Sequence, residues 1–318
     1  MDPLSDMLSL LRVRSYMSGG FDAGGDWSLH FDQHAGIKFY AIVSGECWLC
    51  VDGVPDPVRV QSGDCFLLPR GRAFRMASDM SLTPLGAVTF LSTAQNGRIN
   101  LYNGGGQFFS VCGHFALAGD HADILLGMLP PIVHLYKEAD RAMLRWCVDQ
   151  MMRELREARP GNSLVIEHLA HMMLVQALRL HMAEGPEGGT GWLFALADKQ
   201  VSVAIKRIHD DPARRWTVRS LAESAAMSRT AFSLKFKKMV GTSPMEYLTR
   251  WRMLLAANKL SNAGDSIAVI AASLGYESES AFSTAFKRVM GCSPRAYSRR
   301  RNSHPDRELP ATNVARHA

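Results

Sequence analysis

The chain lacks the long apolar runs that mark membrane-spanning and secreted proteins. No stretch of its 318 residues approaches the roughly 18 continuous apolar residues of a membrane span. The first residues, MDPLSDMLSLLRVRSYM, carry acids where a secretion signal needs basic residues, and their apolar run is short. We therefore expect a cytoplasmic protein that does not enter a membrane.

The sequence motifs of several common enzyme classes are missing as well. There is no P-loop, no GxGxxG, no HExxH and no GxSxG. A single CxxC pair occurs, at Cys47 and Cys50, so the second pair that a zinc site of this type requires is absent. We expect no enzyme activity, no cofactor and no metal.

Charge is present but unevenly distributed. Residues 199–301 hold 19 Lys and Arg against 7 Asp and Glu, a net of +12, whereas the rest of the chain holds 17 against 23, a net of −6. This asymmetry favours a polyanionic partner for the C-terminal third. A solvated basic surface explains the count equally well, so charge alone does not decide.

Residues 27–115 have the composition of a small β-domain. Short runs rich in Ile, Val, Phe, Trp and Cys alternate with Gly, Pro and Asp, and Asp52-Gly53 is a hairpin signal. Many short strands within fewer than about 100 residues predict a small sandwich or barrel.

Helical patterns begin after this segment. Residues 138–158 and 163–183 have apolar residues three and four apart and are separated by RPGN, which predicts a helical hairpin. The second helix has apolar residues on most of its faces, as expected if the β-domain covers one side and a partner subunit the other. The predicted domains are residues 1–135 (a β-domain), 136–183 (a helical hairpin for dimerisation), 184–191 (a linker), 192–301 (a helical domain) and 302–318 (a disordered tail).

A repeat with an offset of 50 residues lies in the basic third. Residues 232–247 read FSLKFKKMVGTSPMEY and residues 282–297 read FSTAFKRVMGCSPRAY, with eight identities in sixteen positions. Such self-similarity indicates a duplicated supersecondary unit.

Each copy can be interpreted physically. Two Phe four residues apart put both rings on one buried helix face, and a following Gly ends the helix in the left-handed conformation. A shorter helix precedes each copy, capped by Thr217 in the first and Ser266 in the second. Helix, tight turn and second helix form the helix-turn-helix plan, in which the second helix is presented to DNA.

At this point the sequence resembles the AraC/XylS family of bacterial transcription regulators. The piece IAASLGYESESAFSTAFKRVMGCSPRAY at 270–297 matches the family signature, and the resemblance covers roughly residues 195–301. It implies a sequence-specific transcription regulator that binds double-stranded promoter DNA as a homodimer, with RNA polymerase as a further candidate partner. Residues 229–239 and 279–289 would be the two recognition helices.

The resemblance also predicts which residues contact DNA. The positions expected to face the bases are Arg229, Thr230, Ser233, Leu234, Ser280, Ser283 and Thr284. Phosphate contacts are expected from Lys235, Lys237, Lys238, Lys287 and Arg288, with additions from Arg214, Arg215, Arg250, Arg252 and residues 299–301.

The chain departs from the family pattern at two of these positions. The family often has Arg where Leu234 and Thr284 stand. Arg reads guanine through two hydrogen bonds worth about 1–3 kcal/mol of discrimination. Without it, we expect reading to depend on thymine methyl groups, hydroxyl groups and DNA shape.

The β-segment resembles the cupin-type sensor domain of one branch of this family. The resemblance rests on GDCFLLPRGRAF at 63–74, VCGHF at 111–115 and LLGMLPPIVHL at 125–135. A metal-binding cupin has His where Phe74 stands and an H-x-H pair that this chain lacks, which argues against a metal. A small-molecule effector would contact the candidate residues His34, Trp48, Phe66 and Phe74, although an ordinary filled core also accounts for them.

Four cysteines are candidates for redox sensing: Cys47, Cys50, Cys65 and Cys112. In a strand, Cys47 and Cys50 face opposite sides, so a local disulfide is not expected. Buried cysteines acting as small apolar side chains are the simpler interpretation.

The predicted fold class is α+β with two domains, a cupin-like β-barrel with a helical hairpin followed by an all-α domain with two helix-turn-helix units. The function that follows is a transcription regulator responding to a small-molecule or stress signal. The alternatives are a cupin enzyme with an appended DNA-binding module, a cysteine-based redox regulator, and a non-specific architectural DNA binder.

Overall fold

The computed structural model describes residues 2–11, 13–87, 98–117, 129–135, 138–157, 159–183, 191–262 and 265–303, and residue 126. The chain divides into a barrel unit, residues 13–118 and 129–184, and a helical unit, residues 1–12, 119–128 and 185–318. Residues 184–190 of the predicted linker and residues 304–318 of the predicted tail lie outside the described part.

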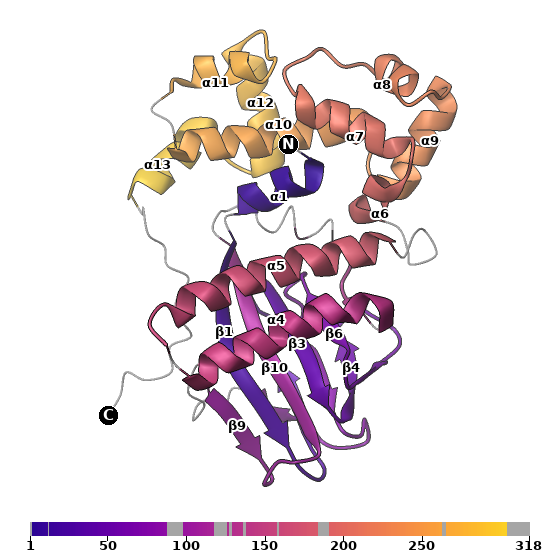
Figure 1. The fold of residues 1–318 in the computed structure, drawn as a ribbon. Coiled ribbons are helices and arrows are strands. Elements are labelled where there is room, and N and C mark those ends of the chain that lie inside the picture. The colour runs from indigo at the N-terminus through magenta and orange to yellow at the C-terminus, as the bar shows by residue number, and fades with distance from the viewer. Residues whose placement is uncertain are drawn as a thin grey trace. The chain divides into compact units, whose positions relative to one another are not determined.

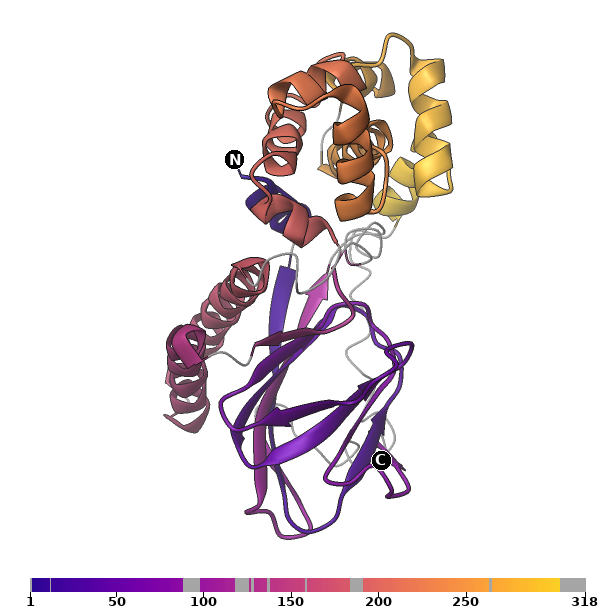
Figure 2. The same ribbon diagram turned by 90° about the vertical axis from the view of Figure 1, so that its right-hand side faces the viewer.

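The strands of the barrel unit are β1 (Val13–Ala23), β2 (Ser28–Phe31), β3 (Ile37–Ser44), β4 (Glu46–Val51), β5 (Val58–Gln61), β6 (Cys65–Leu68), β7 (Phe74–Ala77), β8 (Leu85–Gly86), β9 (Arg98–Tyr102), β10 (Phe108–Leu117) and β11 (Val133–Leu135). They form a six-stranded sheet in the order β11-β6-β3-β10-β1-β9 and a five-stranded sheet in the order β5-β4-β7-β2-β8. The two sheets face each other, as the ribbon in Figure 2 shows. A cluster of buried apolar side chains from both sheets fills the space between them. The predicted small β-domain is confirmed, with two sheets packed around one core.

Strand alternation separates the interior of the barrel from its helix-covered face. In β3, Tyr40 and Ile42 belong to the interior cluster, whereas Phe39 points to the other side and packs on Phe115 with ring centroids 5.4 Å apart. Gly113 lies under the ring of Phe39, and a Cβ there would come within 2.0 Å of it. Only glycine lets Phe39 lie flat on β10 at this point.

Two helices lie along the outer face of the larger sheet, α4 (Glu138–Glu157) and α5 (Asn162–Ala183), as seen in Figure 1. They form the predicted hairpin, with a turn whose Gly161 has a φ of 85°. No helix of the described residues is long and apolar enough to cross a membrane.

The helical unit contains α1 (Pro3–Leu11), α6 (Trp192–Ala197), α7 (Val201–Asp210), α8 (Val218–Ser224), α9 (Arg229–Val240), α10 (Pro244–Asn262), α11 (Ile267–Ser273), α12 (Glu279–Met290) and α13 (Pro294–Ser303). Helices α8 and α9 form one helix-turn-helix unit and α11 and α12 the other, and α10 joins them. The predicted all-α domain with two such units is confirmed.

The caps that define these helices follow from short local sequence signals. The hydroxyl groups of Ser228 and Ser278 accept hydrogen bonds from the third backbone amides of α9 and α12. Gly241 and Gly291 end the same helices with φ values of 85° and 74°. The two units are therefore built alike residue by residue.

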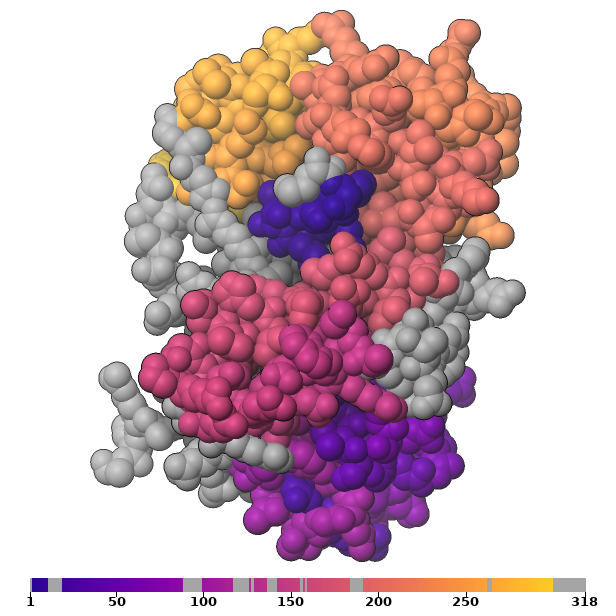
Figure 3. Space-filling view, in the orientation of Figure 1, coloured from indigo at the N-terminus to yellow at the C-terminus, as the bar shows by residue number. Residues whose placement is uncertain are grey.

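The first helix does not belong to the barrel unit, to which the predicted domain over residues 1–135 assigned it. Helix α1 contacts α7 and α10 instead, and its apolar residues Leu4, Met7 and Leu10 are buried. In Figure 3 its indigo atoms lie against the orange atoms of the helical unit. The helical unit is thus assembled from both ends of the sequence.

Candidate DNA-binding interface

Helices α9 and α12 expose the same positions. Along residues 231–240 and 281–290 the pattern of buried, half-buried and exposed residues is identical. In each helix two phenylalanines are fully buried: Phe232 and Phe236 in α9, Phe282 and Phe286 in α12. These four rings fix which face of each helix points to solvent.

The predicted base-reading residues lie on these outer faces. Exposed side chains are Arg229, Thr230, Leu234, Ser280 and Thr284, and half-buried side chains are Ser233 and Ser283. The Thr284 hydroxyl donates a hydrogen bond to the Ser280 carbonyl at 3.0 Å, which leaves its methyl group and oxygen lone pairs for other contacts. Leu234, with 68% of its surface exposed, is the most exposed large apolar side chain of the described residues.

Four of the predicted phosphate-binding cations are free to bind an anion. Lys237, Lys238, Lys287 and Arg288 are exposed, and none forms an ion pair with another described residue. They lie in the last turns of α9 and α12, where cations also complement the helix dipole.

Lys235 is placed differently, because its ammonium is already engaged inside the helical unit. It forms an ion pair with Asp198 at 2.7 Å and donates to the amide oxygen of Gln200 at 3.0 Å. Although burial opposes it, the hydrogen bonds from Lys235 and from backbone amides lower the pKa of Asp198. Lys235 therefore fastens α9 to the junction of α6 and α7.

Arg252 likewise has an internal partner set that sequence reasoning missed. Its guanidinium donates to the carbonyls of Pro212 at 2.7 Å and Arg214 at 2.9 Å, and it stacks on Tyr276 at 5.5 Å. Arg215, in the loop before α8, also forms an ion pair with Glu277, in the turn between α11 and α12. These contacts connect the loop before α8 to the turn between α11 and α12, and so hold one helix-turn-helix unit against the other.

Gly275 makes this connection close. Its φ is +78°, and a Cβ at this position would lie 2.0 Å from the carbonyl oxygen of Ala213. The turn of the second unit thus touches the backbone of the first, which leaves little freedom for the spacing between α9 and α12.

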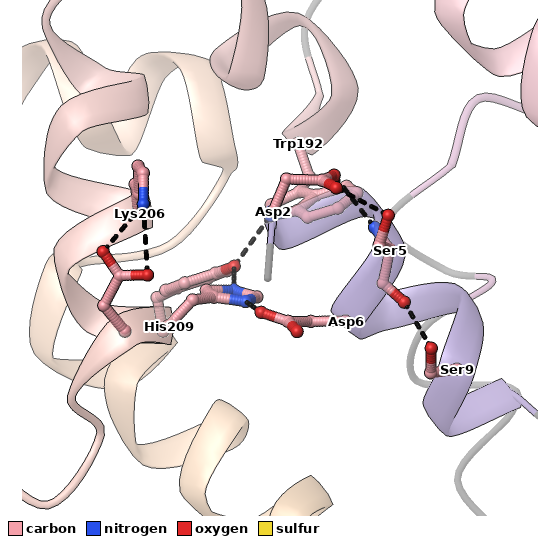
Figure 4. Close-up of polar contacts among 9 residues, drawn as sticks. Asp2, Ser5, Asp6, Ser9, Trp192, Lys206 and His209 are labelled. Carbon is pink, nitrogen blue, oxygen red and sulfur yellow. Dashed lines mark hydrogen bonds and ion pairs between the residues drawn. The ribbon is translucent and has the colours of Figure 1, made fainter.

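Behind the first recognition helix, a chain of buried polar groups ends on α1. Nε1 of Trp192 donates to the hydroxyl of Tyr247 at 2.8 Å, and that hydroxyl lies 2.8 Å from Nε2 of His209. Nδ1 of His209 lies 3.1 Å from a carboxylate oxygen of Asp6, which points at it from α1 in Figure 4. The ring of Tyr247 also packs on Phe236 of α9.

In this series of hydrogen bonds the His209 side chain is neutral. Burial lowers the pKa of His209 to about 4 and outweighs the opposing effect of Asp6. Nδ1–H then donates to Asp6, and Nε2 accepts from the hydroxyl of Tyr247.

In the barrel unit, the structure places the four predicted effector-contacting residues in three different ways. Phe66 and Phe74 belong to the interior cluster, and the ring of His34 meets Phe74 edge-on at 6.0 Å. Trp48 does not line the interior as expected, because its neighbours in β4, Cys47 and Leu49, take the interior positions and alternation turns Trp48 to the opposite face.

The cysteines are all free thiols. As predicted from alternation, Cys47 faces the interior and Cys50 does not. Burial raises the pKa of Cys65 to about 12 and that of Cys112 to about 11, and it raises the pKa of Cys47 further. A thiol is unreactive in this state, because the thiolate is the nucleophile. Among the described residues, no cluster of three or more His, Cys, Asp or Glu could hold a metal ion.

Comparison with known proteins is consistent with this architecture. A family model for cupins matches residues 2–183, and one for helix-turn-helix domains matches residues 221–300. A putative AraC-like transcription regulator of Streptomyces lividans is 42% identical over 281 residues, which cover 88% of this chain and 92% of the relative. The HTH-type transcriptional regulator AlkR of Acinetobacter baylyi is 29% identical over 266 residues, which cover 80% and 85%.

Among solved structures, the DNA-binding domain of AdpA, a global transcriptional factor crystallised with a target DNA, is 27% identical. The match covers 34% of this chain and 99% of that one, with a TM-score of 0.33.

Proposed function

Since this chain belongs to the AraC-like transcription regulators and carries a cupin domain before its helix-turn-helix domain, we propose that α9 and α12 read two successive major grooves of promoter DNA. The chain is a DNA-binding transcription regulator, and the proposal concerns how it recognises its sites. Leu234 and Thr284 contact bases from the centres of the two helices. Lys237, Lys238, Lys287 and Arg288 bind the flanking phosphates.

One observation carries this proposal: two helices with the same buried face, the same caps and the same exposed positions are held in one unit. Grooves on one face of B-DNA recur about every 34 Å. A pair of equivalent helices, joined by α10 and by the contacts of Arg252, suits such a repeating target.

Genome-wide mapping of the sites bound by the full-length protein tests this reading. We expect a recurrent motif of two modules whose centres lie about ten base pairs apart. Binding without any motif, or a motif with only one module, would contradict it.

The apolar side chains exposed on the hairpin support a homodimer. Four large apolar side chains of the hairpin expose between 45% and 59% of their surface: Met143 and Trp146 in α4, and Leu164 and Val165 in α5. A second copy of the chain would cover them. We expect Trp146→Glu to shift the protein toward monomer in sedimentation experiments, with Val203→Glu in the helical unit as the control.

The barrel unit is the proposed sensor of a small-molecule effector, and the protein acts without catalysis. Its relatives are named as transcription regulators, not as enzymes. RNA polymerase is the proposed partner on promoter DNA, and the cytoplasm the proposed location. Loss of a promoter-DNA shift on deletion of residues 199–318 would support the regulator, whereas a stoichiometric iron or zinc ion would favour the cupin enzyme.

A further inference from the structure

A lysine points into one end of the barrel. Lys38 lies in β3 two residues before Tyr40, whose ring is in the interior cluster, so alternation turns the Lys38 side chain the same way. Across the ladder it pairs with His114 of β10. Basic residues are rare inside a barrel unless something compensates their charge.

Aromatic rings, not acids, surround its ammonium. Nζ of Lys38 lies 5.1 Å from the ring centroids of both Phe31 and Phe74, which stack on each other with centroids 4.4 Å apart. It makes no hydrogen bond or ion pair with any residue that the structure describes. The carboxylate of Asp32, which acts on Lys38 electrostatically without a direct ion pair, keeps 78% of its side chain in solvent and lies beside His30.

A second polar group at this end also lacks a partner. Nε2 of His34 is buried without a hydrogen bond among the described residues, while Nδ1 lies 3.4 Å from the Ala35 carbonyl. Both His34 and Lys38 lie against the ring of Phe74. The side chains of Phe31, His34 and Lys38 are only half-buried, so this end is reachable from solvent.

The Lys38 ammonium and the Nε2 atom of His34, which have no hydrogen-bond partner among the described residues, are unfavourable at this position. Burial lowers the pKa of Lys38 to about 8, so the side chain is still mostly charged at neutral pH. Removing an ammonium from water without a direct ion pair is unfavourable, although the half-exposure of Lys38 to solvent reduces that cost. An anion would remove that cost, and flat apolar groups would pack on the rings.

We propose that this end of the barrel binds a small carboxylic acid with a flat apolar body. The carboxylate pairs with Lys38, the body packs on Phe31 and Phe74, and Nε2 of His34 forms a hydrogen bond to the ligand. The proposal rests on the proposed role of the barrel unit as a small-molecule sensor, and it names the chemical class of the effector.

Phenylacetate and its neutral analogue phenylacetamide test the proposal on the full-length protein. Isothermal titration should show binding of phenylacetate and at least about tenfold weaker binding of phenylacetamide. Lys38→Met should weaken phenylacetate binding by a similar factor, whereas Lys38→Arg and the exposed control Arg59→Met should retain it. Equal affinity for the two compounds, no binding of phenylacetate at millimolar concentration, or unchanged binding by Lys38→Met would overturn the proposal.

The pH dependence of binding gives a readout that a purely structural lysine would not change. The titratable groups facing Lys38 are Asp32, His34, His114 and Cys112. Burial lowers the pKa values of both histidines and raises that of Cys112 to about 11. Between pH 7 and 9.5 the two histidines and Cys112 then keep their charge state while Lys38 loses its proton. Phenylacetate affinity should therefore fall above about pH 8 in the wild type and stay level in Lys38→Arg.

A shift assay with promoter DNA and no added acid separates this proposal from the role in DNA binding. Normal shifts by Lys38→Met together with lost phenylacetate binding would support the ligand site. Normal shifts together with any of the contrary binding results would refute the ligand site alone.

Discussion

In the proposed mode of DNA binding, Leu234 determines which bases the helix α9 can distinguish. An apolar side chain in this position contacts thymine methyl groups and cannot form the paired hydrogen bonds with which Arg selects guanine. Its exposure leaves it free to make that contact. The specificity of this module should therefore be modest and centred on A·T pairs.

Truncation of Leu234 tests this view. Leu234→Ala should weaken binding to the best site by roughly 1 kcal/mol. It should also reduce the preference for one base over the others at a single base pair of the site. Competition binding with single-base variants of the site measures it, and Val203→Ala on α7 serves as the control. A uniform loss across all sequences would mean that Leu234 contributes only to folding.

His209 makes the stability of the helical unit depend on pH. The pKa of this histidine is about 4 in the folded protein, below the ordinary value of 6.5. Between these values the unfolded chain binds the extra proton, so the free energy of unfolding must decrease as pH falls from about 6.5 to 4. The loss should be about 2 kcal/mol at pH 5.

Urea denaturation of the wild type and of His209→Gln at pH 7.5 and pH 5 measures this effect. The variant should be less stable at pH 7.5 and should lose less on acidification. An equal loss in both proteins would show that another group is responsible.

At the scale of elements, the spacing between α9 and α12 depends on backbone contact at Gly275. Two left-handed glycines of the helical unit allow a matched comparison, because a Cβ at Gly291 would meet nothing within 4 Å. Gly291→Ala should cost about 1 kcal/mol from backbone strain alone. Gly275→Ala should cost more, because the Ala213 carbonyl must also move.

The two variants should also differ in how they bind DNA. Gly275→Ala is expected to weaken binding to a two-module site while leaving binding to an isolated module nearly unchanged, and Gly291→Ala should affect both alike. Fluorescence anisotropy with the two DNA lengths makes this comparison. Parallel losses would indicate that the two helix-turn-helix units do not need a fixed spacing.

The elements that the sequence predicts well are those whose signals are local. Ser228, Gly241 and the paired phenylalanines lie within fourteen residues of one another, and each acts through backbone bonds or contacts inside one helix. The hydrogen-bond partners of Lys235 and Arg252 lie 35 to 40 residues away, and no spacing rule points to them. Alternation could have excluded Trp48, because its neighbours in β4 cannot face the same side.

At the scale of the whole molecule, the helical unit is completed by residues that start the chain. Asp6 and His209 are separated by 203 positions in the sequence. A helix of nine residues is too short to be stable alone, so α1 depends on the surface of α7 and α10.

Asp6→Ala should therefore destabilise the C-terminal third of the protein by about 1–3 kcal/mol, because the buried Nδ1–H of His209 loses its acceptor. Asp6→Asn keeps an acceptor oxygen and should cost less. Hydrogen exchange of α7 and α10 in the full-length variants measures the effect. Faster hydrogen exchange confined to α1 would show that the contact between Asp6 and His209 does not stabilise the helical unit.

Synthesis on the ribosome gives this feature a further consequence. Helix α1 emerges well before the surface that buries Leu4, Met7 and Leu10, which is encoded about 200 residues later. At translation rates of about 5–20 residues per second this is a wait of roughly 10–40 s. During that interval its apolar face has no place to pack. The α1 segment therefore stays unpacked while the barrel unit is synthesised, and it is buried only after α7 and α10 have left the ribosome.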